Sequence, residues 1–476
     1  MGTLDYCLIA VYFVATLGLG WFVGTGQKTI KDFFHGDRSI PWWAAMCSGV
    51  ATIVSGVSYL GSPGLAFSTN YNWLQFRLAV PFALLIICCI LLPLFYKMGV
   101  YSIYEYLERR FDRRTRLLSA CMFVFLKCGY LSVVIYASSL VLAEIVPLPF
   151  GVITITVGMV TALYTLVGGI KAVIWTDTLQ LGVFVGGIIA TISVVLSQVD
   201  GGVSTIIDIA DRSGRLDFFN FSTDWTQTYT FWGCVFGGMF MIISQFGTDQ
   251  AEIQRYLTTR TARDANVAMI FSHLALVVVG FGLFFIGTAL FAFYSLHPEK
   301  GGLESSANRI YAKFIVEEMP VGMKGLLVGA VLAASMSTIS SVLNSLATVT
   351  LADLVPAISK RTPTLASARW ITLVFGGITT GLACFGGQFG NLLDASNRII
   401  NLFGGSLVGT FLLGTLCRNA NAPGAFWGLI LGTIAVVALE ITTEVSFMWF
   451  GPFSAGISFF GGLLISSLWR LRIARP

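Results

Sequence analysis

The chain has 476 residues, of which 55% are hydrophobic and only 11% are charged, and its mean hydropathy is +0.80. Soluble domains carry roughly 25% charged residues, so this composition excludes a soluble globular protein. The formal net charge of +5 is too small to indicate a nucleic-acid-binding protein. The 3 histidines and 9 cysteines show neither a zinc-site spacing nor a disulfide framework, which argues against a membrane-embedded enzyme and against a bound cofactor.

Apolar segments of about 20 residues predict an all-α integral membrane protein with about thirteen transmembrane helices. The first segment has no basic leader and is long enough to span a bilayer, so we expect a transmembrane helix there and not a cleaved signal. The predicted helices are 5–24, 41–67, 73–95, 117–143, 148–168, 173–197, 229–254, 266–294, 322–352, 366–385, 393–416, 423–441 and 451–469.

Basic residues gather in alternate loops, which predicts an outer N-terminus, an inner C-terminus and a multi-pass protein of the plasma (inner) membrane, with the lipid bilayer as its surroundings. The predicted inner loops contain Lys28, Lys31, Arg38, Lys97, Arg109, Arg110, Arg113, Arg114, Arg116, Lys171, Arg255, Arg260, Arg263, Lys360, Arg361, Arg369, Arg418, Arg470, Arg472 and Arg475. Two long outer loops, 198–228 and 295–321, carry acidic residues, and we expect them to form lids or short surface helices.

Two predicted helices are interrupted by polar and small residues. The second reads VATIVSGVSYLGSPG over 50–64, and the seventh reads ISQFGTDQ over 243–250. Backbone carbonyls freed at such breaks are tolerated inside a membrane only where they line a cavity or bind an ion. Breaks at corresponding positions of two five-helix halves are typical of inverted-repeat transporters. The alternative is that the glycines and serines only allow the helices to pack closely.

The ninth predicted helix has one face lined with oxygen. Ala334, Ser337, Thr338 and Ser341 follow the i, i+3, i+4, i+7 spacing of a helix face, and Ser340 lies beside them. Hydroxyl and carbonyl oxygens without thiol or imidazole suit an alkali cation such as Na⁺. Hydrogen bonds from these hydroxyls to their own helix are the alternative.

Ionisable residues inside predicted spans are candidate functional groups, because burying a charge in a membrane is costly. Asp177 could supply a carboxylate to an ion near the serine face, or it could pair with Lys171 or a helix N-terminus. Arg77 could recognise an anion in a cavity, or its side chain could extend to the outer surface. Lys127 receives no role from the sequence.

Several segments together resemble the sodium/solute symporter family over residues 42–416. They are LPLFYK at 92–97, YEYLERRF at 104–111, GGIKAVIWTD at 168–177, QRY at 254–256 and SSVLNS at 340–345. The resemblance implies a LeuT-like 5+5 inverted repeat with alternating access. It divides the chain into an extra N-terminal helix and loop (1–40), a transport core (41–416, with repeats 41–197 and 229–416) and two C-terminal helices (417–476).

The resemblance also implies sodium sites. By position, a first Na⁺ would be bound by the carbonyls of Ala51, Val54 and Ala334 and by the hydroxyls of Ser337 and Thr338. A second Na⁺, present in some members of the family, would be bound by Asp177, Ser337, Ser340 and Ser341. All of these positions carry suitable oxygens here.

The substrate cavity that the resemblance implies contains Ser55, Ser58, Trp73, Arg77, Gln245 and Asn397. The segments FGGMFM at 236–241 and QAEIQRYL at 250–257 resemble the monocarboxylate and multivitamin branch, and other segments resemble bacterial sialic acid symporters. The arginine that holds the sialic acid carboxylate in that second branch is matched here by Tyr130. Arg77 could replace it, because a guanidinium can hold a carboxylate through two hydrogen bonds.

The sequence therefore predicts a sodium-coupled symporter of a small organic solute, with a carboxylate-bearing anion as the first choice. A sodium/sugar symporter is the alternative within the family, since Gln245 and Asn397 could bind hydroxyl groups. A membrane sensor that has lost transport is the alternative from another class.

Overall fold

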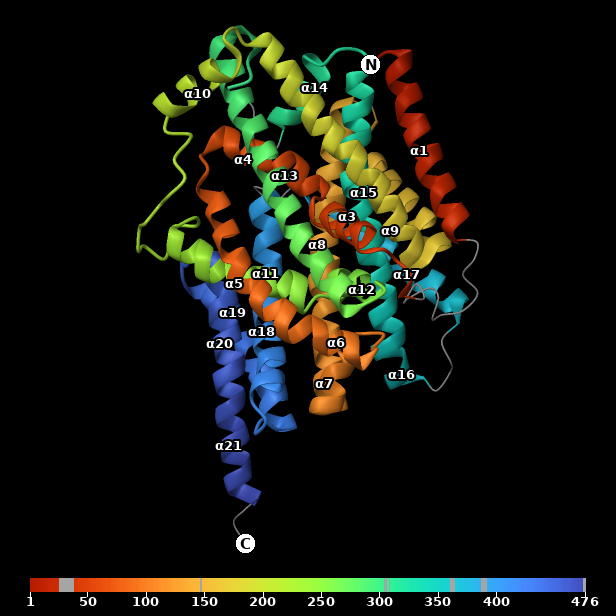
Figure 1. Cartoon of the computed structure of the whole chain (residues 1–476), viewed down its shortest axis with the longest axis vertical. Helices are drawn as coiled ribbons and strands as arrows, with labels where there is room; N and C mark the ends of the chain where they lie inside the picture. The colour runs from red at the N-terminus through yellow and green to blue at the C-terminus, as the bar shows by residue number, and fades with distance from the viewer. Residues whose placement is uncertain are drawn as a thin grey trace.

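The computed structural model describes residues 1–24, 38–145, 148–303, 306–307, 309–359, 364–386 and 392–473. These residues form an elongated, almost wholly helical bundle whose termini lie at opposite ends of its long axis (Figure 1). The predicted inner loop that contains Lys28 and Lys31 falls largely outside the described residues, as do Lys360, Arg361 and Arg475.

Within the described ranges, nine helical segments are long and apolar enough to cross a membrane, and a bent helix pair makes a tenth. The nine are α1 (Thr3–Gly24), Asn72–Met98, Arg113–Leu140, Gly169–Gln198, α13 (Ala262–Leu296), Met323–Ile358, α18 (Leu392–Leu416), α19 (Ala422–Thr442) and Phe447–Leu471. The segments predicted at 148–168, 229–254 and 366–385 are helical too, the last as α17 (Leu365–Ala383), but they are not among these spans. An all-α protein with many apolar spans is confirmed.

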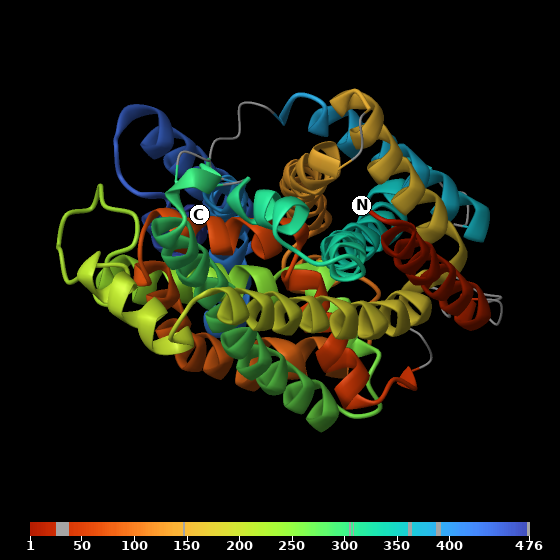
Figure 2. The ribbon, with the colours of Figure 1, turned by 90° about the horizontal axis from the view of Figure 1, so that it is seen from above.

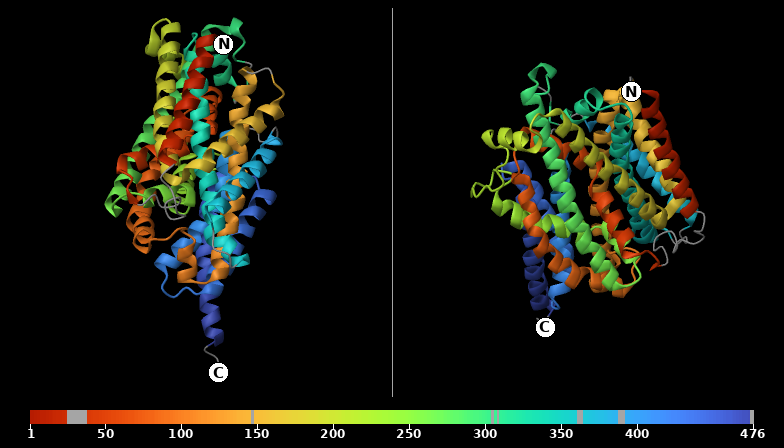
Figure 3. Two further views of the ribbon diagram at one scale, coloured as in Figure 1. Left: turned by 90° about the vertical axis from the view of Figure 1, so that its right-hand side faces the viewer. Right: turned by 45° about the horizontal axis from the view of Figure 1, so that its top comes forward.

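Several spans are built from consecutive helices. Asn72–Met98 comprises η2 (Asn72–Ala79), α5 (Val80–Ile86), η3 (Ile87–Leu91) and α6 (Leu92–Met98), and α7 (Glu105–Arg110) and α8 (Arg113–Ile145) follow it. The last span comprises η8 (Phe447–Trp449), α20 (Phe450–Gly456), η9 (Ile457–Gly461) and α21 (Gly462–Ile473). The end of α21 extends beyond the rest of the bundle (Figure 3).

The two predicted helix breaks are present. The first separates α3 (Trp42–Ile53) from α4 (Gly56–Ser68), which are bent by 60° relative to each other. The second follows η4 (Gly233–Gly237) and α11 (Gly238–Gly247) and precedes α12 (Gln250–Leu257). Both breaks occur where glycine and hydroxyl residues replace the aliphatic residues of an ordinary span, and the second break also contains Asp249.

A third bend lies inside α9 (Phe150–Gln198). Gly169 has φ 49° and ψ −171°, a conformation that residues with a Cβ rarely adopt, so glycine at this position allows the bend. It separates the two predicted spans 148–168 and 173–197 and sets the direction of the segment that carries Asp177.

The two long outer loops contain α10 (Gly202–Arg212), η5 (Pro298–Lys300) and α14 (Ile310–Glu317). α10 and α14 lie at the end of the bundle that holds the N-terminus (Figure 1). Surface helices were expected, but α14 is largely buried, and the Tyr311 hydroxyl lies 2.7 Å from the Thr191 hydroxyl on α9. Its apolar face therefore belongs to the packed core.

The centre of the bundle is α15 (Met323–Val349), which continues through η6 (Thr350–Leu354) into α16 (Val355–Ile358). Its serine face is buried throughout, and it packs against α1, α3, α8, α9 and α17. Seen from above, α1 and the C-terminal helices lie at opposite edges of the bundle, outside this centre (Figure 2).

Candidate functional site

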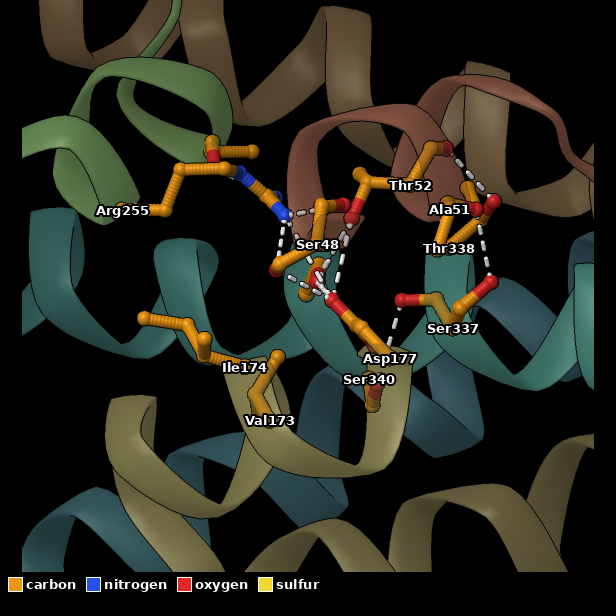
Figure 4. Close-up of polar contacts among 12 residues, drawn as sticks. Ser48, Ala51, Thr52, Val173, Ile174, Asp177, Arg255, Ser337, Thr338 and Ser340 are labelled. Atoms are coloured by element: carbon orange, nitrogen blue, oxygen red, sulfur yellow. Dashed lines mark hydrogen bonds and ion pairs between the residues drawn. The ribbon is translucent and has the colours of Figure 1, made fainter. Parts of the chain in front are cut away.

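The serine face of α15 meets the end of α3 at the first helix break. The Ser337 hydroxyl donates to the Ala51 carbonyl (2.7 Å), and the Thr338 hydroxyl donates to the Thr52 carbonyl (2.7 Å; Figure 4). These carbonyls are available because α3 ends at Ile53, which leaves the last turn of the helix without intrahelical donors. Both hydroxyls also reach the Ala334 carbonyl, at 3.1 and 3.2 Å.

Hydrogen bonds of Ser337 and Thr338 thus connect four of the five predicted ligands of the first Na⁺ into one cluster. Val54, the fifth, is the buried residue that directly follows α3. The Thr52 carbonyl was not predicted. It becomes accessible to Thr338 only because the chain bends directly after Ile53, which the residue pattern alone did not locate to a single residue.

Asp177 lies at the centre of a second polar cluster in the same region. Its Oδ2 atom accepts hydrogen bonds from the hydroxyls of Ser48 (2.6 Å), Thr52 (3.3 Å) and Ser341 (3.3 Å). Its Oδ1 atom is buried and has no hydrogen-bond partner in the part of the chain that the structure describes. An unpartnered buried carboxylate oxygen is costly, so this atom is a natural position for a cation.

The other predicted members of this cluster come from α15. Ser340 donates to the Ser337 carbonyl (3.1 Å), and the hydroxyls of Ser341 and Thr52 lie 3.0 Å apart. The structure therefore brings Asp177 into contact with Ser341, with Ser337 and Ser340 on the neighbouring turn. Ser48 and Thr52 were not predicted, although their i, i+4 spacing places them on one face of α3.

Arg255, on α12, supplies the positive charge next to Asp177 (Figure 4). Its Nη1 atom lies 3.4 Å from Asp177 Oδ2 and donates to the Ser48 carbonyl (2.7 Å) and hydroxyl (2.5 Å). Its Nε atom lies 3.5 Å from a carboxylate oxygen of Glu252, which is also buried. The sequence did not reveal this pairing, although Arg255 belongs to the QRY segment.

A cavity of about 60 Å³ lies between the two helix breaks, η2, α8, α13 and α18. Five of the six predicted substrate residues line it: Ser58, Trp73, Arg77, Gln245 and Asn397. Ser55, the sixth, lies at the first break, where its hydroxyl accepts from the Ser58 backbone N–H (3.4 Å) and caps α4.

The cavity carries a positive charge and uncommitted polar groups. The Arg77 guanidinium lies 4.4 Å from the Phe76 ring centroid and 5.7 Å from that of Trp73, and it makes no hydrogen bond or ion pair with any described residue. The carboxamides of Gln245 and Asn397 likewise make no hydrogen bond within the described ranges. No Asp or Glu is among the described lining residues. An arginine without a counter-ion is well suited to bind an anion.

The cavity is also lined by two residues that the sequence did not predict as contacts of the solute. Tyr130 and His273 both face this cavity, from α8 and α13. The ring centroid of Tyr130 lies 5.2 Å from the ammonium nitrogen of Lys127. Lys127 forms a buried ion pair with Asp249. The other carboxylate oxygen of Asp249 caps α12 by accepting from the Ala251 N–H (2.8 Å). Lys127 therefore links α8 to the second helix break.

Comparisons with known proteins agree with this geometry. The chain is 31% identical to the sodium/sialic acid symporter NanT of Aliivibrio fischeri, over 94% of this chain and 90% of that protein. It is 33% identical to the human sodium-coupled monocarboxylate transporter 1, over 90% of this chain and 72% of that protein. A solved substrate-bound, outward-open structure of a Na⁺-coupled sialic acid symporter superposes with a TM-score of 0.90 at 29% identity, covering 98% of both chains.

The match to a family is equally extensive. Residues 33–432 match the sodium:solute symporter family, which includes both helix breaks, the serine face, Asp177 and every residue that lines the cavity. Its relatives couple transport to sodium and are transporters, not enzymes. The chain therefore belongs to the sodium:solute symporter family.

Proposed function

We propose that this protein imports a small carboxylate anion together with two Na⁺ ions across the plasma membrane. The observation that carries the choice of solute is the Arg77 guanidinium, which lines the cavity without a hydrogen bond or ion pair to any described residue. Relatives that transport sialic acid and monocarboxylates also carry organic acids, which supports an anion.

The residues that line the cavity favour a small acid over sialic acid. Tyr130 lines the cavity at the position where the resemblance to sialic acid symporters implies a carboxylate-binding arginine. We therefore take a short-chain carboxylate, and not a nine-carbon sugar acid, as the first candidate solute.

The two oxygen clusters are the proposed sodium sites. The first Na⁺ would bind Ala51, Val54, Ala334, Ser337 and Thr338, and the second would bind Asp177, Ser337, Ser340 and Ser341. The close contacts of Ser337 with Ala51 and of Ser341 with Asp177 support this assignment. The sialic acid symporter structure was described with a novel Na⁺ site, which supports a second ion in this fold.

Sodium would drive the cycle by favouring one conformation. An ion held between α3 and α15 pins the first helix break against the serine face, and this completes the cavity beneath Arg77. Coupling requires Na⁺ to favour the outward-facing or occluded state by a few kcal/mol. Each inward Na⁺ contributes about 2.3 kcal/mol per 100 mV in addition to its gradient.

The proposed topology places the N-terminus outside and the C-terminus inside, with thirteen transmembrane helices. Residues 41–197 and 229–416 form the two inverted repeats of the core, and 1–40 and 417–476 flank it. The termini at opposite ends of the bundle and the two equivalent breaks support this arrangement.

A sugar is the second candidate solute. The carboxamides of Gln245 and Asn397 are free of hydrogen bonds to described residues and could each bind hydroxyl groups. The two candidates are separated by Na⁺-driven uptake into proteoliposomes of butyrate against a hexose. Uptake of butyrate would support the proposal. Uptake of the hexose alone would show that the transported solute is a sugar and not an anion.

A further inference from the structure

His273 is a buried histidine, and the hydrogen bond that its ring makes shows which ring nitrogen can accept a hydrogen bond from a ligand. It lies on α13, is 1% exposed, lines the cavity and packs against Phe246 with ring centroids 4.2 Å apart. Its Nδ1 atom lies 2.9 Å from the Met269 carbonyl. A carbonyl can only accept, so Nδ1 carries the proton, and Nε2 of the neutral ring is an acceptor.

The Nε2 atom of His273 has no hydrogen-bond partner in the described part of the chain. A buried acceptor without a donor is costly, and native proteins rarely leave one unless a ligand or water completes it. The cavity that His273 lines is the space from which such a donor would come.

Arg77 lines the same cavity as His273. A Cβ atom built on Gly280 of α13 would lie 3.5 Å from Arg77 Nη2, so the guanidinium packs against that residue. Gly280 follows His273 by seven residues, which places both on one face of α13 with about 10 Å between them along the helix axis. The cavity is therefore lined both by a cation, Arg77, and by a neutral acceptor, His273.

We propose that His273 is a specificity-determining residue, and that the transported anion carries a hydroxyl or N–H donor remote from its carboxylate. This inference rests on the proposed function and narrows its substrate class. 4-Hydroxybutyrate is the probe of this class, because it carries a carboxylate at one end and a hydroxyl donor at the other.

The test uses four matched acids and the full chain in proteoliposomes under an inward Na⁺ gradient. 4-Hydroxybutyrate has the remote donor, butyrate lacks it, 4-methoxybutyrate keeps the oxygen without the proton, and 2-hydroxybutyrate moves the hydroxyl next to the carboxylate. We expect 4-hydroxybutyrate to have about a tenfold higher apparent affinity than the other three.

Substitutions of His273 test whether this residue causes the preference for 4-hydroxybutyrate. His273→Leu should make the four acids equal, whereas His273→Gln, which restores an acceptor, should keep part of the preference. His297→Leu is the matched control, because His297 is outside the cavity and pairs with Glu299. Na⁺-dependent thermal stabilisation of each variant shows that it is folded.

The outcomes separate the two proposals. Equal affinities for the four acids in the unmodified protein, with Na⁺-dependent uptake of all of them, would overturn the inference and leave the proposed function intact. A preference that survives in His273→Leu would overturn the role of His273. Absence of Na⁺-dependent uptake for every acid would overturn the proposed function and the inference with it.

Discussion

The Asp177 carboxylate and the Arg255 guanidinium are both fully buried and lie 3.4 Å apart, from Oδ2 to Nη1. The guanidinium also donates to Ser48, so it is held on one side of the carboxylate. The second carboxylate oxygen, Oδ1, has no hydrogen-bond partner among the described residues and is not engaged by Arg255. Oδ1 is therefore the atom to which we propose that the second Na⁺ binds, while Oδ2 keeps its protein counter-ion.

Removing the charge of Asp177 should remove the second sodium ion. Asp177→Asn keeps the shape of the side chain but lowers its attraction for a cation, and Ser341→Ala removes a neighbouring oxygen. For both variants we expect the Hill coefficient of Na⁺ activation to fall from about 2 towards 1. The control is Asp208→Asn on the exposed face of α10. An unchanged Na⁺ activation curve in both variants would refute a second site at Asp177.

Removing hydroxyl groups from α15 should weaken the binding of Na⁺ at the first site. Thr338→Val and Ser337→Ala each remove a hydroxyl that faces the first helix break. Thr338→Val also preserves the shape of the side chain. We expect the Na⁺ concentration for half-maximal uptake to rise about tenfold or more. Ser345→Ala is a matched control, because its hydroxyl donates to Val342 within its own helix. Normal Na⁺ dependence in Thr338→Val would contradict the assignment.

Arg77 should be needed for transport of the solute and not for binding of Na⁺. Arg77→Gln removes the charge that recognises the carboxylate, so we expect uptake of the acid to be abolished. Arg77→Lys keeps the charge without the bidentate geometry and should retain weak transport. Na⁺-dependent stabilisation, measured by thermal unfolding in detergent, should persist in both variants. Uptake by Arg77→Gln with unchanged affinity would show that Arg77 is structural.

The Lys127–Asp249 ion pair should stabilise the second helix break. Lys127→Met leaves the Asp249 charge buried without a partner, and we expect a loss of about 3–5 kcal/mol in the free energy of unfolding. Asp249→Asn keeps the oxygen that caps α12, so the double variant should recover much of this loss. Unchanged stability of Lys127→Met, or no recovery in the double variant, would contradict this role of the ion pair.

Much of the fold could be predicted because membrane burial leaves a strong signal in composition. The two helix breaks followed from glycine, proline and hydroxyl residues in positions where a span is normally aliphatic. The oxygen-lined face of α15 followed from helical periodicity, and the structure buries that face entirely. These features depend on residues close together in the sequence.

The partners of the site residues depend on tertiary packing and could not be predicted. Arg255 and Asp177 are 78 positions apart in the sequence, and they meet because α12, which carries Arg255, and α9, which carries Asp177, both pack against α3. The burial of α14 was missed because its segment lies in a loop with acidic residues at its ends, which concealed the apolar face that includes Tyr311. His273 was missed because its isolated position in an apolar span gives no periodic signal.

The most direct test of the central claim is uptake of a short-chain carboxylate into proteoliposomes that contain only this protein. With an inward Na⁺ gradient, we predict accumulation of the acid above its external concentration, accompanied by inward positive charge because two Na⁺ enter with one anion. Replacing Na⁺ by K⁺ should abolish accumulation. Uptake of the acid that is unaffected by this replacement would contradict sodium-coupled symport.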